Sequence, residues 1–224
     1  MYDAVIFDWD GTLADTREII VHAFQKVLRK IGCRVSDEFL ERRIGIGSIN
    51  MFKEALEAAG IQYDEEMIEN LLKEKTRIHL ELTPKVRLFD GVLSLLESLR
   101  PRVKIALATM SGREVIDKTL REKGLRRYFD YILTADEVEK PKPDPEVFLK
   151  CAEAIGCKPE KCVVIEDSIF GVIAARRAGM RCIAIPSGFY SRSELEREKP
   201  DLIVDSVREK DKILAYIFGK NESS

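Results

Sequence analysis

Near the N-terminus the chain reads Ala4-Val5-Ile6-Phe7-Asp8-Trp9-Asp10-Gly11-Thr12, and this stretch decides the fold. Its four apolar residues predict a strand that is buried on both faces, as in a parallel sheet. Two aspartates follow at once, which is costly because each carboxylate raises the pKa of the other and burial adds a further penalty. A cation bound between them would remove much of that cost. Open α/β sheets bind their ligands at this carboxyl edge of the strands.

The segment 16–85 contains four helical patterns and no convincing strand. Its apolar residues recur at helical spacing, and Ser36, Ser48 and Asp64 stand where N-terminal caps are expected. Four short amphipathic helices can bury their apolar faces against one another. We therefore expect an inserted all-α helical bundle over residues 16–85, which divides a core domain into the segments 1–15 and 86–224.

Strands and helices alternate through the rest of the chain. Apolar runs predict strands at residues 103–108, 131–133, 162–165, 182–185 and 202–204, with helical patterns between them. Such alternation is typical of an α/β fold with a doubly wound, mostly parallel sheet.

Polar residues gather where the predicted strands end. Taken singly, each cluster has an ordinary explanation as a helix cap, a surface lysine or an acidic turn. Because the carboxyl ends of parallel strands lie at one edge of the sheet, four such clusters together indicate one site. The clusters are Asp8 with Asp10, Thr109 with Ser111, Lys140 after a looser strand, and Glu166 with Asp167.

The composition of the chain argues against nucleic-acid and membrane partners. The 224 residues include 37 basic and 39 acidic side chains, a net charge of −2, and no basic block that would indicate nucleic-acid binding. No apolar run approaches the roughly 20 residues that cross a bilayer. We expect a cytoplasmic, membrane-free protein, a monomer in the first instance, with a dimer left open.

The five cysteines are odd in number and never in a Cys-x-x-Cys spacing, which indicates buried structural thiols rather than a zinc site. Charged residues reach 34% while amides are few, a composition typical of thermophiles. In such an organism a disulfide among Cys151, Cys157 and Cys162 would be possible inside the cell.

In their order and spacing these clusters resemble the four motifs of the haloacid dehalogenase (HAD) superfamily, in the group of phosphatases whose helical cap follows the first strand. Phosphoglycolate phosphatases and β-phosphoglucomutases belong to this group. The resemblance covers nearly the whole chain. It rests on the stretch 8–15, on Thr109 with Ser111, on Lys140 in the stretch 140–145, and on the stretch 166–180.

The resemblance implies a mechanism. Asp8 would be the nucleophile that forms an aspartyl-phosphate, and Asp10 the general acid and base. Phosphoryl oxygens would be held by Thr109, the backbone N–H of Met110, Ser111 and Lys140. Mg²⁺, which suits hard oxygen ligands, would be held by Asp8, the backbone carbonyl of Asp10 and Asp167, with Glu166 either a further ligand or a group that positions the ligands.

The substrate implied is a small phosphorylated metabolite, either phosphoglycolate or a sugar phosphate. The turn 43–47 resembles a loop that phosphoglycolate phosphatases direct at the site, so Arg43, Gly45 and Arg113 are candidate substrate-binding residues. The Glu166-Asp167 pair resembles the sugar-phosphate members instead. Thr12 favours a phosphatase, while a β-phosphoglucomutase-like mutase stays open.

A different class also stays open, namely a phosphoacceptor signalling domain or a protein that binds phosphate without turnover. Signalling receivers also place clustered aspartates, a threonine and a lysine on a doubly wound sheet. They carry no inserted helical domain and no acid or base two residues after the acceptor. The insert and Asp10 therefore count against this class.

Overall fold

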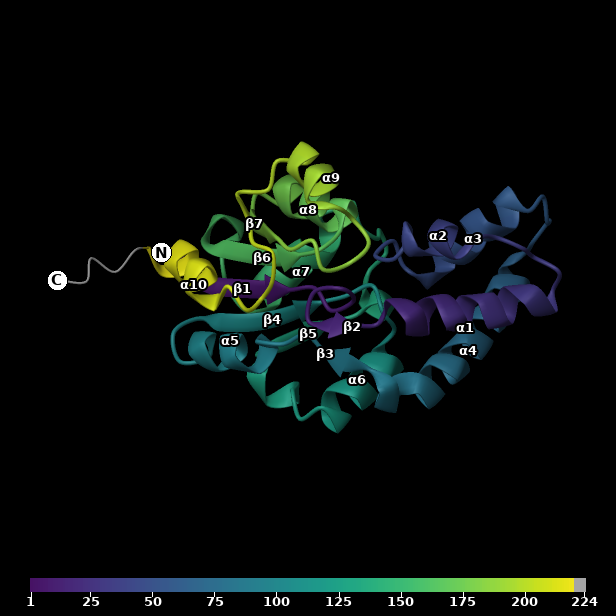
Figure 1. Cartoon of the computed structure of the whole chain (residues 1–224), viewed down its shortest axis with the longest axis horizontal. Coiled ribbons are helices and arrows are strands. Elements are labelled where there is room, and N and C mark those ends of the chain that lie inside the picture. Colours follow the sequence, from purple (N-terminus) through teal and green to yellow (C-terminus); the bar gives the residue numbers. More distant parts are fainter. Residues whose placement is uncertain (220–224) are drawn as a thin grey trace.

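The computed structural model describes residues 1–219, and its centre is a six-stranded parallel sheet in the order β5-β4-β1-β6-β7-β8 (Figure 1). The strand Ala4–Phe7 (β1) lies in the middle, with Val5 beside Ile105 on one side and Val163 on the other. This is the doubly wound α/β fold that the sequence predicts. The other strands are Lys104–Ala108 (β4), Tyr131–Leu133 (β5), Cys162–Glu166 (β6), Arg181–Ala184 (β7) and Leu202–Ile203 (β8).

Helices cover both faces of the sheet, because successive side chains of each strand point to opposite faces. Val5 and Phe7 pack on one face against three helices, Val92–Leu99 (α5), Arg113–Glu122 (α6) and Lys210–Phe218 (α10). Ala4 and Ile6 pack on the other face. The helices there are Glu146–Ala154 (α7), Ile169–Arg177 (α8) and Arg192–Arg197 (α9).

Four helices form a separate apolar cluster beyond the carboxyl edge of the sheet, where Figure 1 shows them projecting from the core. Phe24 and Phe52 meet at its centre, with ring centroids 4.5 Å apart. Ser36 and Asp64 cap their helices as predicted, accepting from backbone N–H groups three residues on. The helices are Arg17–Lys30 (α1), Asp37–Glu41 (α2), Ser48–Ala58 (α3) and Glu65–Leu82 (α4). We call α1–α4 the cap.

The two chain crossings between cap and core lie side by side, as the short antiparallel pair Ala14–Asp15 (β2) and Arg87–Leu88 (β3). The predicted domain boundaries fall at this pair, and the division into core and cap stays a proposal. Residues 220–224, at the end of the predicted core segment, lie outside the described residues.

Some local predictions need correction. The helix α3 is preceded by Gly47 at the cap position, so Ser48 does not act as the N-cap. The sequence patterns do not predict α9, β2 or β3, each of which is six residues long or shorter. Short 3-10 turns also occur at Thr83–Lys85, Arg126–Tyr128, Ala135–Glu137 and Pro159–Lys161.

Within residues 1–219, no helix combines the length and the apolar character that a membrane crossing requires. All five cysteines are free thiols, four of them buried, so the disulfide considered for Cys151, Cys157 and Cys162 does not form in this structure.

Candidate active site

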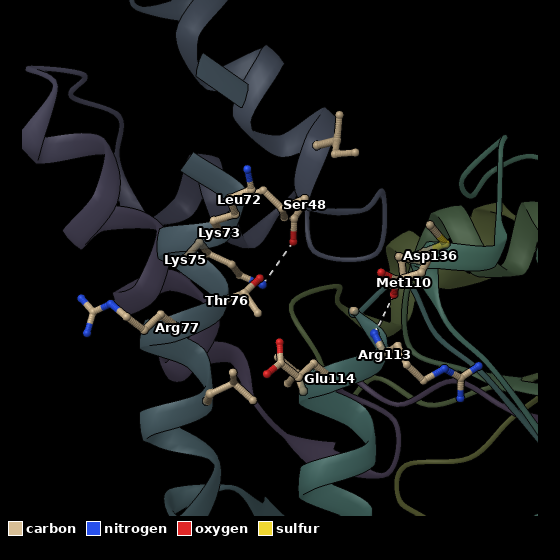
Figure 2. Close-up of a pocket in the computed structure, with 15 residues that line it drawn as sticks. Ser48, Leu72, Lys73, Lys75, Thr76, Arg77, Met110, Arg113, Glu114 and Asp136 are labelled. Carbon is tan, nitrogen blue, oxygen red and sulfur yellow. Dashed lines mark hydrogen bonds between the residues drawn. The ribbon is translucent and has the colours of Figure 1, made fainter. Parts of the chain in front are cut away.

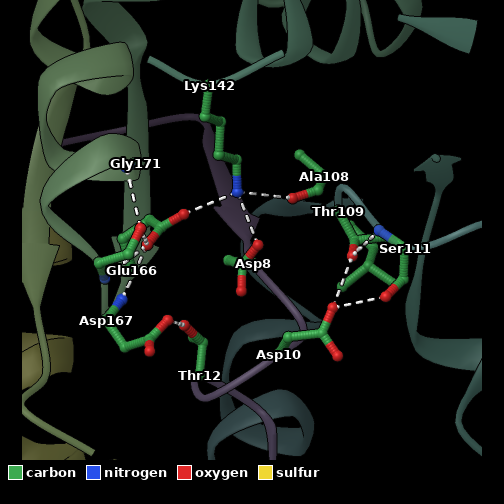
Figure 3. Close-up of polar contacts among 12 residues, drawn as sticks. Asp8, Asp10, Thr12, Ala108, Thr109, Ser111, Lys142, Glu166, Asp167 and Gly171 are labelled. Carbon is green, nitrogen blue, oxygen red and sulfur yellow. Dashed lines mark hydrogen bonds and ion pairs between the residues drawn. The ribbon is translucent and has the colours of Figure 1, made fainter. Parts of the chain in front are cut away.

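The carboxylate of Asp8 lies in a buried charge cluster at the end of β1 (Figure 3). Nζ of Lys142 donates to Asp8 Oδ1 and to Glu166 Oε1, both at 2.6 Å, and lies 3.4 Å from the carbonyl oxygen of Ala108. The strands β1, β4 and β6 are neighbours in the sheet, so their ends bring these groups together around one ammonium. Burial lowers the pKa of Lys142, but the two carboxylates outweigh it, and its net pKa is raised.

The prediction of Lys140 in this position is wrong, because Lys142 occupies it. The backbone N–H groups of Glu139 and Lys140 both donate to the carboxylate of Glu146, at 3.0 and 2.8 Å. This anchor holds that part of the loop at the surface, with the side chain of Lys140 exposed. Two residues later the chain has turned inward, and Nζ of Lys142 lies 5.1 Å from the centroid of the Phe148 ring.

Glu166 is held by donors on both of its carboxylate oxygens. Besides the bond from Lys142, its Oε2 accepts from the backbone N–H groups of Asp167 and Ser168 at 2.9 Å, and from Ser168 Oγ at 3.0 Å. A Cβ at Gly171 would stand 1.9 Å from the carboxylate, so the first turn of α8 approaches this closely only because that residue is glycine. Of the two metal roles considered for Glu166, this geometry favours the positioning of neighbours over direct ligation.

Asp167 is packed between two glycines. A Cβ at Gly11 or at Gly188 would lie 2.2 or 1.7 Å from its Oδ2, while Thr12 donates to its Oδ1 at 3.0 Å. Burial, followed by the charges of Glu166 and Asp8, raises the pKa of Asp167. The same burial raises the pKa of Asp8, against the opposing effect of Lys142. The protein alone therefore does not offset the cost of ionising both carboxylates.

Asp10 is oriented by hydroxyl groups. Its Oδ2 accepts from Ser111 at 2.6 Å and from Thr109 at 3.4 Å, and its Oδ1 accepts from Thr16 at 2.8 Å. Thr109 and Ser111 thus lie at the predicted site, where in this structure they hold Asp10 (Figure 3). Thr16 stands at the start of α1, so Asp10 is also tied to the first residue that leads into the cap.

These residues fit a divalent cation of the Mg²⁺ type. Asp8, Glu166 and Asp167 each place a carboxylate oxygen within 4.8 Å of the others, and all three are buried. Three buried carboxylates face one ammonium, which leaves an excess of negative charge. A hard cation bound by oxygen ligands would balance it.

A cleft of about 520 Å³ opens beside this cluster, between the cap helices α3 and α4 and the start of α6 (Figure 2). Lys75 of α4 reaches its wall and donates to Ser48 Oγ at 3.1 Å. The side chain is buried, and no carboxylate in the described part of the chain lies within 4.0 Å of its Nζ. Desolvation lowers the pKa of Lys75 to about 8. Sequence reasoning missed this lysine.

Two residues predicted to contact substrate, Arg43 and Arg113, have their guanidinium groups engaged elsewhere. Arg43 is engaged inside the cap, where it donates to Glu54 at 2.6 Å, so the structure does not bring it to the site. Arg113 lines the cleft, but its guanidinium is bound to the Ile132 carbonyl and to Glu137, away from the cleft (Figure 2).

Gly45 and Met110 do lie at the site. A Cβ at Gly45 would be 3.5 Å from Ser168 Oγ, so the turn 43–47 rests on the core beside the acidic cluster. The side chain of Met110 lies under Gly47 and lines the cleft. Their predicted contacts with substrate stay predictions.

Comparison with known proteins agrees with this geometry. Residues 5–185, which include the whole charge cluster, match the model of the haloacid dehalogenase-like hydrolases. The chain belongs to this family. The predicted superfamily and fold are therefore confirmed, and the chain is an enzyme of the phosphatase type.

Individual relatives of this HAD-like hydrolase are named for phosphate-ester chemistry. The chain is 36% identical over 186 residues to a phosphorylated carbohydrates phosphatase of Thermotoga maritima, covering 81% of this chain and 83% of the relative. It is 31% identical over 210 residues to phosphoglycolate phosphatase 1 of Pseudomonas aeruginosa, covering 92% and 77%. The crystal structure of a hydrolase from Pseudomonas syringae superposes with a TM-score of 0.89 at 29% identity, covering 97% and 99%.

Proposed function

We propose that this chain is a magnesium-dependent phosphomonoester hydrolase that acts on a phosphorylated carbohydrate through an aspartyl-phosphate on Asp8. The observation that carries the proposal is the Asp8 carboxylate itself. One of its oxygens accepts a hydrogen bond from Lys142 at 2.6 Å, and Asp10, two residues later, is held by the hydroxyl of Ser111 at 2.6 Å.

Asp8 is the nucleophile. Its oxygen forms a bond to phosphorus as the bond from phosphorus to the leaving alkoxide breaks. Lys142 stabilises the negative charge that gathers in the transition state, because it already stands among these groups and need not reorganise. The same ammonium orients the Asp8 carboxylate and lowers its pKa, which opposes the larger effect of burial.

Asp10 moves the protons. In its acid form it gives a proton to the leaving oxygen, and as a carboxylate it then takes one from the water that hydrolyses the aspartyl-phosphate. The hydroxyls of Ser111, Thr109 and Thr16 hold it in place through both steps.

Asp8, Asp167 and the backbone carbonyl of Asp10 would hold Mg²⁺, with Glu166 fixing its neighbours. When bound, the ion supplies positive charge that lets two anions, the carboxylate and the phosphate, approach each other. Gly11 and Gly188 leave the space that Asp167 needs to take part in such a site.

The cleft favours a phosphorylated carbohydrate over phosphoglycolate. Its volume of about 520 Å³ falls in the range that holds ligands of drug-like size, and a two-carbon acid would leave most of it empty. Lys75 is a buried cation that forms no ion pair with any carboxylate of the described residues 1–219, so an anionic or hydroxyl-rich substrate would supply the missing contacts.

The test is release of inorganic phosphate from a panel of phosphomonoesters, with and without Mg²⁺, by the wild type and by Asp8→Asn. We expect Mg²⁺-dependent turnover that is highest on pentose or hexose phosphates and absent in the variant. Appearance of an isomeric sugar phosphate in place of inorganic phosphate would identify a mutase. Turnover by a well-folded Asp8→Asn variant would exclude Asp8 as the nucleophile.

A further inference from the structure

The segment 187–194, which runs from the loop after β7 into the first turn of α9, touches the turn after β1, the Asp167 carboxylate and the cap. Ser187 Oγ donates to the carbonyl oxygen of Gly11 at 2.6 Å, in the turn after the nucleophile. Gly188 packs directly against the Asp167 carboxylate. Two residues later, the hydroxyl of Tyr190 donates to the carbonyl oxygen of Arg42 at 2.6 Å, across the boundary between core and cap.

Tyr190 is a rigid donor. Its side chain is 4% exposed, and its ring meets those of Phe170 and Phe189 edge to face, at centroid distances of 6.3 and 6.1 Å. Burial raises the pKa of Tyr190 to about 12, so the hydroxyl keeps its proton at neutral pH. Phe170 also packs against the apolar cluster of the cap, which makes this aromatic group part of both domains.

Arg42 is the matching group on the cap. It ends α2, and its side chain pairs with Glu194 at 3.1 Å and lies 5.0 Å from the centroid of the Phe189 ring. The turn 43–47 follows immediately and lies over Ser168 and Met110. Whatever fixes Arg42 to the core therefore fixes this turn over the active site.

The docked turn forms part of the wall of a small space beside the reacting carboxylates. A cavity of about 20 Å³, enough for about one water molecule, is lined by Asp10, Asp167 and Gly188 from the core and by Ile44 from the cap, with Tyr190 at its edge. If the turn lifted, this space would lose the wall that Ile44 supplies and would be wider open to solvent next to the general acid and base.

We propose that Tyr190 is a positioning residue that docks the turn 43–47 of the cap onto the core and so holds the site in its closed form. This rests on the proposed function for its effect on catalysis, but the docking itself is a property of the chain alone. The Arg42–Glu194 ion pair is a second and weaker contact between the cap and the core, because both side chains are partly exposed to solvent.

The experiment compares Tyr190→Phe with Tyr63→Phe. Tyr63 donates to Glu57 at 2.7 Å inside the cap, so its variant also loses one tyrosine hydroxyl bond, but at a position away from the domain boundary. Amide hydrogen exchange of the turn 43–47 is measured for both variants and the wild type. A net hydrogen bond corresponds to about 2- to 10-fold in an equilibrium, so we expect exchange of this turn to accelerate by that factor in Tyr190→Phe alone.

Steady-state kinetics provide a second, independent measurement. If docking precedes chemistry, part of the substrate binding energy shifts the cap to its docked position. Because Tyr190→Phe makes that position less populated, it should raise KM by up to about 10-fold with kcat nearly unchanged. Glu194→Gln should shift both readings in the same direction by a smaller factor. Exchange in 43–47 that stays at the wild-type rate overturns the proposal. Acceleration spread equally over β1 and β6 also overturns it, since that marks a merely structural role. A wild type without phosphatase activity would contradict the proposed function and leave the exchange test to decide the docking.

Discussion

Two buried lysines, Lys142 and Lys75, differ in what balances their charge, and on the proposed function this difference separates a fixed catalytic group from a group that awaits its ligand. Lys142 has two carboxylates at 2.6 Å, so its charge is compensated within the protein. Within residues 1–219, the recorded contacts of the Lys75 ammonium are a hydroxyl at 3.1 Å and an aromatic ring whose centroid lies at 5.3 Å. A buried ammonium without an anion is destabilising, and it is retained where a substrate later supplies the contact.

Replacing Lys142 with Met should lower kcat by about 10²- to 10³-fold, because a preorganised charge at the reacting carboxylate is lost. Lys140→Met is the matched control. It changes the same residue type two positions away, on the surface, and should keep kcat within a factor of about two. Steady-state kinetics on the best ester of the panel measure both. Equal losses in the two variants would contradict the assignment of Lys142.

Lys75→Met should weaken substrate binding and strengthen the fold. KM should rise in the variant, and in the wild type KM should rise as the pH passes through 8 and the ammonium is lost. Its folded pKa lies below the ordinary value of 10.5, so the unfolded chain binds more protons between these values, and stability increases with pH in that window. At pH 7 the variant should be more stable by on the order of 3 kcal/mol.

Denaturant unfolding at pH 7 and pH 10 measures the stability difference, with Lys73→Met, an exposed neighbour on the same helix, as the control. A Lys75→Met variant with unchanged KM and an unchanged free energy of unfolding would show that the buried charge neither contacts substrate nor destabilises the fold.

The pattern of buried strands predicts from the sequence that most residues of the candidate site lie at the carboxyl edge of the sheet. Asp8, Thr109 and Glu166 follow long apolar strands, and parallel strands carry their ends to one edge. Lys142 could not be told from Lys140, because both stand in an irregular loop where no period applies. The burial of Lys75 could have been predicted from its position in the helical pattern. It occupies an apolar position of its helix, in the series Ile68, Leu71, Lys75 and Ile78.

At the scale of elements, the close approach of backbone turns to carboxylates positions the site. The turn after β1 and the segment after β7 both press against Asp167, and the first turn of α8 presses against Glu166. In each case a glycine gives the necessary room. Sequence patterns predicted the long elements. The elements β2, β3 and α9 were not predicted, because two to six residues are too few to show a helical or strand periodicity of apolar side chains.

Gly188→Ala should impair metal binding, since the new Cβ would stand 1.7 Å from Asp167 Oδ2 and would have to displace that carboxylate. We expect the affinity for Mg²⁺ to fall at least about 10-fold, the size seen when groups that orient ligands are disturbed. Gly112→Ala is the control, because its nearest neighbour lies at 3.8 Å. Calorimetric titration with Mg²⁺ measures both variants, and equal affinities would exclude Asp167 from the metal site.

At the scale of the whole molecule, excess negative charge at the junction of core and cap links metal binding to stability. The folded pKa values of Asp8 and Asp167 are raised above the ordinary value of 3.8, mainly by burial. The folded protein therefore binds more protons than the unfolded chain just above pH 3.8, and these two groups make the metal-free fold less stable as the pH rises through that window.

Saturating Mg²⁺ should consequently raise the Tm, and the increase should be larger at pH 7.5 than at pH 5, because protons compete for the same oxygens. The difference between samples with Mg²⁺ and with chelator at each pH cancels the contribution of all other groups. Asp167→Asn should abolish the increase at both pH values. A Tm that is the same with Mg²⁺ and with chelator at pH 7.5 would contradict the metal assignment.

The central claim is that Asp8 carries the phosphoryl group during turnover, and trapping that species tests it most directly. Asp10→Asn should let the intermediate accumulate, because the water that attacks it has lost its base while Asp8 and Lys142 stay in place. The variant is mixed with Mg²⁺ and an activated aryl phosphate, whose leaving group needs little protonation by Asp10, and is then quenched in acid before its peptides are mapped by mass spectrometry. We predict one phosphoryl group per chain, on the peptide that contains Asp8. A phosphoryl group on any other residue, or turnover by the variant with Asp8 unmodified throughout, would contradict the account.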